Sequence, residues 1–170
     1  MGVAAAAAAA DFKGAAAGRA AAAQEGPGDM MWWLNRTRLA RSFDHDRIKR
    51  AIEDAEQATS GTIVVSVAPY FIGSVRRAAE IAFKRLGVVQ SQHRNGVLFF
   101  IVPGRRQFVV LGDVAIHHSV GPSFWEAVAQ GVSARFRAGD MNGGLVDAIH
   151  DVAQRLAEHF PREQATGDNA

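Results

Sequence analysis

An uninterrupted apolar run near the middle of the chain constrains the fold more than any other feature. Gly96–Val102 reads GVLFFIV, without a single polar side chain. Such a run is typical of a central strand that is covered on both faces. A short turn at residues 103–105 separates it from a second strand-like run, Arg106–Leu111, so the two predict a β-hairpin. We therefore expect Phe99 and Phe100 to be buried on opposite faces of one sheet.

The flanking segments predict the rest of the element order. Thr62–Ala68 is rich in β-branched residues and lies between a glycine and a proline, which indicates a further strand. Apolar residues recur at spacings of three and four in four segments, which predicts amphipathic helices: Asp44–Ser60, Ser74–Leu86, Ser123–Arg137 and Asp140–Phe160. The order α-β-α-β-β-α-α predicts an α/β fold, a three-layer α/β/α sandwich with a small mixed sheet. Its first two strands should be parallel, with a right-handed connection.

The predicted domain occupies residues 42–161, between an N-terminal segment at 1–41 and a polar tail at 162–170. Residues 1–29 are rich in alanine and glycine and offer almost nothing to bury, so we expect them to be disordered. Trp32, Trp33 and Arg36 follow. We favour a strap whose tryptophans pack on the folded domain. The other interpretation is a peripheral membrane contact, with tryptophans at headgroup level and arginines on phosphate.

Composition excludes several classes of protein. The chain has no cysteine, which excludes disulfides, thiolate zinc sites and cysteine nucleophiles. Its formal net charge is only +2, which argues against nucleic acid as the main partner. We expect the partner to be another protein, whose identity the sequence does not give. Phosphate-loop, dinucleotide-binding and serine-hydrolase motifs do not occur. We find no convincing signal peptide or transmembrane helix, so we expect a cytoplasmic or membrane-peripheral location.

The topology sorts the loops onto two edges of the sheet. One edge carries Arg105 and Arg106 near the start of the second helix, and we interpret it as a solvated basic rim rather than an anion site. The other edge gathers groups that form hydrogen bonds or bind metals, and these are the candidate ligand-binding residues: His93, Asn95, Asp113, His117 and His118. Gly96 and Gly112 flank them and could let the backbone approach a ligand closely.

The chemistry of this second edge leaves three interpretations open: a metal site, a polar-ligand site and a structural loop. Histidine and carboxylate suit zinc, nickel or copper, but the spacing matches no metal signature. His117 and His118 would point in opposite directions in an extended loop. We do not expect calcium to bind, because Asp113 is the only carboxylate in these loops. We expect no resident cofactor, with zinc as the better candidate for any divalent metal. In the structural interpretation, Asp113 accepts backbone N–H bonds in a turn.

Several short motifs occur in an order that resembles the TPM domain family over residues 42–161. They are Ser60–Thr62, Phe83–Gly87, Asn95–Phe100, Val109–Asp113 and Phe136–Leu145. The family includes a thylakoid acid phosphatase and small bacterial domains of unknown role, and the resemblance implies a sheet sandwiched between helices.

The resemblance also bears on function, because the thylakoid members carry acidic residues that are linked to calcium and phosphatase activity. Here Gln90, Gln92 and His93 occupy the first of those loops, and Gly121 stands about where those members have a second acid. We therefore expect a non-catalytic interaction or accessory module without catalytic residues. The alternative is a metal-assisted acid phosphatase.

Overall fold

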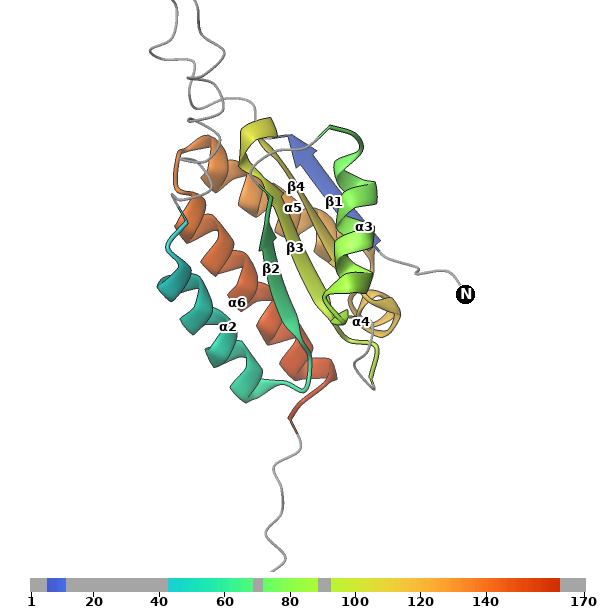
Figure 1. The fold of residues 1–170 in the computed structure, drawn as a ribbon. Helices are drawn as coiled ribbons and strands as arrows, with labels where there is room; N and C mark the ends of the chain where they lie inside the picture. Colours follow the sequence, from blue (N-terminus) through green and yellow to red (C-terminus); the bar gives the residue numbers. More distant parts are fainter. Residues whose placement is uncertain (1–5, 12–42, 69–71, 89–92, 163–170) are drawn as a thin grey trace, which may run out of the picture.

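The predicted order α-β-α-β-β-α-α is present, and a strand at residues 6–11 and a short helix after the hairpin are additional to it. The computed structural model describes residues 6–11, 43–68, 72–88 and 93–162 (Figure 1). Its strands are β1 Ala6–Asp11, β2 Ile63–Val67, β3 Val97–Val102 and β4 Gln107–Gly112. Its helices are α2 His45–Ala58, α3 Val75–Arg85, α4 Val114–Val120, α5 Pro122–Arg137 and α6 Met141–His159, with a short 3-10 helix, η2, at Pro103–Arg105. None of the helices in these ranges combines the length and apolar character that a membrane crossing requires.

The four strands form one mixed sheet in the order β1-β4-β3-β2. β2 pairs in parallel with β3, with Val65 opposite Phe99. β3 pairs antiparallel with β4, with Phe99 opposite Val110. The predicted parallel pair, hairpin and α/β element order are therefore confirmed. The three helices α2, α5 and α6 cover one face of the sheet, and α3 covers the other (Figure 1).

The structure differs from the sequence interpretation at Ala6–Asp11, which we expected to be disordered. This segment forms β1, an antiparallel neighbour of β4 that places Ala6 opposite Gly112. An alanine run has no strand-like side-chain pattern, but its backbone can satisfy the N–H and C=O groups that β4 presents at its outer edge. The remainder of the predicted N-terminal segment, with Trp32, Trp33 and Arg36, lies outside the described residues.

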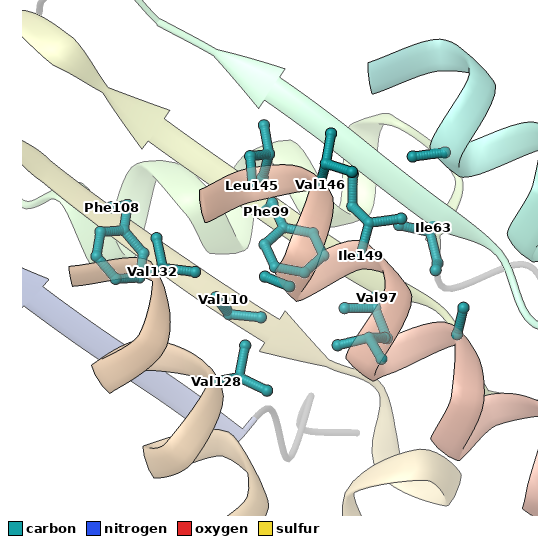
Figure 2. Close-up of a cluster of buried hydrophobic side chains, with 14 of the residues drawn as sticks. Ile63, Val97, Phe99, Phe108, Val110, Val128, Val132, Leu145, Val146 and Ile149 are labelled. Atoms are coloured by element: carbon teal, nitrogen blue, oxygen red, sulfur yellow. The ribbon is translucent and has the colours of Figure 1, made fainter. Parts of the chain in front are cut away.

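Two buried cores lie on opposite faces of β3, every residue of which is buried. The larger core lies under α2, α5 and α6 and contains Phe99 with Leu145 and Ile149 of α6 (Figure 2). The smaller core lies under α3 and contains Phe100 with Phe83. The prediction that the two phenylalanines are buried on opposite faces is confirmed.

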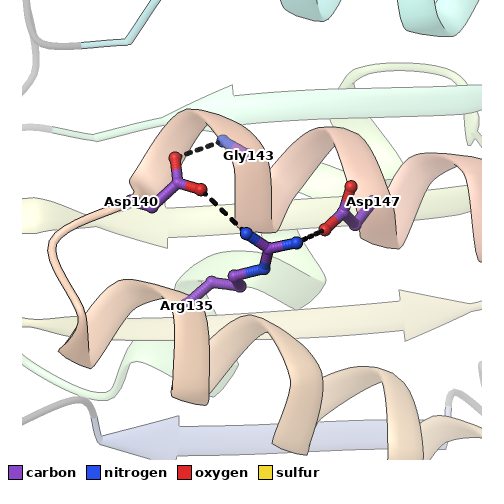
Figure 3. Close-up of polar contacts among 4 residues, drawn as sticks. All are labelled: Arg135, Asp140, Gly143 and Asp147. Carbon is purple, nitrogen blue, oxygen red and sulfur yellow. Dashed lines mark hydrogen bonds and ion pairs between the residues drawn. The ribbon is translucent and has the colours of Figure 1, made fainter.

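The turn between α5 and α6 is fixed by polar contacts around the start of α6. Gly139 adopts a φ of 86°, in the left-handed region that favours glycine. Asp140 then caps α6 by accepting a hydrogen bond from the Gly143 N–H at 2.8 Å. Arg135 of α5 bonds to the carboxylates of Asp140 at 3.2 Å and Asp147 at 2.6 Å (Figure 3). These half-exposed ion pairs hold the turn in register, and each contributes about 0.2–1 kcal/mol.

The helices α5 and α6 approach closely just after this turn. A Cβ atom at Gly144 would lie 2.6 Å from Arg135 Cβ and 3.3 Å from a ring carbon of Phe136. Because the obstructing atom belongs to the rigid base of the arginine side chain, the space cannot open without moving a helix. Close packing of the two helices therefore explains the glycine at position 144, within the motif at residues 136–145.

Candidate functional site

The predicted ligand edge is organised around one buried carboxylate. Asp113 directly follows β4, and its side chain is fully buried. Arg94 donates to both of its oxygens, from Nε to Oδ2 at 2.8 Å and from Nη2 to Oδ1 at 2.8 Å. This two-pronged pairing matches the planar guanidinium to the planar carboxylate and is among the stronger protein hydrogen-bond geometries. The sequence interpretation did not single out Arg94.

The carboxylate of Asp113 also begins a helix that we had predicted as a loop. Its Oδ1 accepts a hydrogen bond from the backbone N–H of Val114 at 2.7 Å, which makes Asp113 the N-cap of α4. The helix ends at Val120, and its C-cap is Gly121, whose φ is 74°. Of the three interpretations, the structural one included a backbone N–H bond to Asp113, and this bond is present, but at the start of a helix. The predicted extended loop at residues 112–121 was wrong.

The helical conformation changes where the two neighbouring histidines lie. His117 and His118 occupy successive positions of α4, so their side chains diverge by about 100° rather than pointing to opposite faces of a strand. Their ring centroids lie 6.0 Å apart. His118 is exposed, and His117 is half-buried, with its Nδ1 shielded from solvent. Of the two imidazoles, only that of His118 is therefore fully accessible to a ligand from solvent.

The guanidinium of Arg94 is a permanent positive charge beside Asp113. The hydrogen bond from Arg94 to Asp113 is the larger cause that raises the pKa of the guanidinium above its usual value, and the Coulomb attraction between the two groups adds to it. Arginine is already protonated throughout the physiological range. The positive charge of Arg94 therefore persists beside Asp113 throughout that range, and it opposes the approach of a metal cation.

Asn95 and His93 differ in exposure although they are neighbours in the chain. Asn95 is fully buried, and its Nδ2 donates to Ser60 Oγ at 3.3 Å, which connects this loop to the segment before β2. His93 is exposed in the preceding turn. The structure therefore uses Asn95 within the fold and leaves His93 at the surface.

The two glycines that we expected to admit a ligand have their space filled by other side chains. A Cβ at Gly96 would collide with Val88, and a Cβ at Gly112 would collide with the ring of Trp125. Both neighbours are buried. The absence of a side chain at these positions thus lets the core close, and neither position opens toward a ligand.

The predicted set does not meet at a single point. In the ranges that the structure describes, no three His, Cys, Asp or Glu side chains gather in a way that could hold a metal ion. An ion pair at this edge joins Asp113 to Arg94, which lies next to Asn95 in the sequence. The available signal was that Arg94 and Asp113 flank the two strands of the predicted hairpin, which brings them to the same edge.

The opposite edge of the sheet is held by internal contacts. Arg105 of η2 donates to the carbonyl oxygen of Gly73, just before α3. Arg76 forms an ion pair with Glu80 at 3.2 Å on the exposed face of α3. Both arginines therefore have partners within the domain.

A mixed sheet between helices, with an arginine–aspartate pair at the end of the hairpin, defines a small α/β domain. The chain belongs to the TPM domain family, whose model matches residues 39–155. It is similar to the protein BA42 of the psychrophilic bacterium Bizionia argentinensis, known from an NMR structure, with 30% sequence identity and a TM-score of 0.68. The match covers 76% of this chain and 91% of BA42. No curated protein matches the chain.

Proposed function

We propose that this TPM domain is a non-catalytic interaction or accessory module. The observation that supports the proposal is the engagement of Asp113. Both of its oxygens accept hydrogen bonds from Arg94, and one also caps α4. A buried carboxylate with these partners stabilises the junction of β4 and α4. Its two oxygens already accept three hydrogen bonds, and the guanidinium of Arg94 lies beside it, so a metal cation that approached this carboxylate would meet a positive charge.

The role of the remaining edge residues fits the same proposal. Asn95 bonds within the fold, whereas His93 and His118 are exposed on separate elements. Metal-assisted phosphate hydrolysis needs ligands that converge on the metal and hold it beside the substrate. Two exposed histidines without an available carboxylate supply a weaker donor set than that chemistry uses.

Hydrolysis of a generic aryl phosphate by the full chain tests the proposal. We expect no product above the protein-free rate, whether calcium, magnesium, zinc or a chelator is added. The matched variant is His93→Ala, which removes the exposed imidazole without touching the core. Metal-dependent turnover that falls about tenfold or more in His93→Ala, a loss of about 1.4 kcal/mol of transition-state stabilisation, would contradict the proposal and establish the acid phosphatase alternative. Turnover that the substitution leaves unchanged would also contradict it and would place the active site elsewhere.

A further inference from the structure

One edge of the sheet is covered and the other is open. Within the described ranges, β1 covers the outer side of β4, whereas β2 pairs only with β3. An edge strand presents a row of unpaired N–H and C=O groups, and proteins usually protect it with charges, proline or a bulge. β2 reads IVVSV and carries none of these residues. Its residues after Ile63 are all partly exposed.

The ladder between β2 and β3 shows which backbone groups of β2 face outward. Thr62 O accepts from Val97 N at 2.8 Å, and Ala68 N donates to Ile101 O at 2.9 Å. Successive residues of a strand direct their N–H and C=O groups to opposite sides, so even-numbered residues of β2 face β3. The odd-numbered residues, with Val65 at the centre, therefore direct both groups to the open edge.

A groove lies along this edge, because α2 extends beyond β2 on one face of the sheet (Figure 1). Its volume is about 450 Å³. The residues that line it come from α2 and β2: His45, Ile48, Lys49, Ile52, Glu53 and Glu56 of α2, and Val65 and Val67 of β2. Ile48 and Ile52 of α2 thus lie beside the outer edge of β2, which pairs with no further strand among the described residues.

We propose that this groove binds an extended segment of another polypeptide, which adds to β2 as a further strand. The inference rests on the proposed function and names the surface through which the module would act. Main-chain bonds to the outward groups of Val65 and Val67 would hold the segment, and apolar side chains at alternate positions would pack on Ile52. The other alternate positions face solvent, so the partner is an amphipathic strand.

Charge at the rim adds a requirement for the partner. Lys49 already forms an ion pair with Glu53 at 3.5 Å, and Arg162 donates to the carbonyl oxygen of Glu56 at 2.6 Å. The carboxylate of Glu56 lies one turn beyond Glu53 on the exposed side of α2. A segment with a basic residue at this end therefore complements the groove, by the modest amount expected for exposed charges.

A second copy of the chain fits this edge less well than an extended segment does. A two-fold axis through paired β2 strands would keep both α2 helices on the same face of the joined sheet. Each helix extends past its own β2 into the space beside the strand. The two copies of α2 would then compete for one volume, whereas a single added strand needs only the groove.

The test uses a capped heptapeptide that alternates valine and threonine between terminal arginines, titrated into the isotope-labelled full chain and followed by NMR. We expect the largest amide shifts at Val65, Val67 and Ile52, together with slower hydrogen exchange at Val65. A peptide of the same sequence that is N-methylated at the amides on one edge should not bind, because it cannot complete the ladder.

Two lysine substitutions separate the groove from a general effect of charge. Ile52→Lys is expected to weaken binding of the heptapeptide about tenfold or more, which corresponds to about 1.4 kcal/mol. Ile81→Lys is the matched control on α3, where Ile81 is 46% exposed, and should leave binding unchanged. Equal weakening by both substitutions would overturn the inference.

Other outcomes would overturn it as directly. These are shifts confined to residues outside β2 and α2, equal binding of the N-methylated peptide, and a Val65 amide that is already protected without peptide. In the last case the edge is occupied by this chain or a second copy, and the concentration dependence of the protection shows which. An active phosphatase that binds the peptide would overturn only the proposed function. An inactive chain that fails to bind it would overturn only this inference.

Discussion

Replacing Phe99 or Phe100 with alanine is expected to lower the free energy of unfolding by about 3–5 kcal/mol, as measured by urea denaturation. Phe99 is 1% exposed in the larger core, and Phe100 is 5% exposed in the smaller core. Either truncation removes most of a buried aromatic side chain and leaves a cavity that the packed helices cannot fill. Because the two residues face opposite layers, each substitution reports on a different half of the sandwich.

The matched control for these truncations is Ile72→Ala. Ile72 is 93% exposed, so removing its side chain should change stability by no more than about 0.5 kcal/mol. A loss of less than about 1 kcal/mol for Phe100→Ala would contradict the account, because it would mean that α3 does not seal its face of the sheet.

Removing the carboxylate of Asp113 is also expected to lower the stability of the domain strongly. Asp113→Ala abolishes the cap of α4, worth about 1 kcal/mol, and the hydrogen bonds of a buried charged group, worth about 1.5–3 kcal/mol. The urea denaturation midpoint should therefore fall clearly below that of the parent chain. Asp113→Asn should lose less stability, because the amide oxygen can still accept from Val114 N–H.

A parent-like midpoint for Asp113→Ala would contradict the structural role of this residue. That result is typical of a residue retained for ligand binding, whose removal often relieves unfavourable electrostatics. Exchange of the Val114 amide provides an independent measurement, since its acceptor is lost in Asp113→Ala and kept in Asp113→Asn.

The sheet could be predicted from the sequence because its evidence is local. The run at Val97–Val102 indicates a strand covered on both sides whatever packs against it, and the structure confirms this. The seven residues of α4 are too few to show a helical period, and their histidines and flanking glycines are equally typical of a loop. β1 escaped prediction because alanine has no preference for strands, so only the neighbouring edge explains its conformation.

The site was harder to predict because its contacts are tertiary. Asp113 and Arg94 are 19 residues apart in the sequence, and only the return of β4 beside β3 brings them together. Gly112 shows the same limitation, since the ring that fills its space belongs to Trp125 on α5. The sequence identified which groups reach this edge, but it could not show which of them were already bonded.

The central claim is that Asp113 belongs to the fold and is not free to bind a hard cation. Calcium is the discriminating ion, because it requires several carboxylate or carbonyl oxygens at once. The direct test is a calorimetric titration of the full chain with calcium, with Asp113→Asn as the matched variant. We expect no sub-micromolar binding and the same titration for both proteins. Sub-micromolar calcium binding by the parent chain that is lost in Asp113→Asn would contradict it.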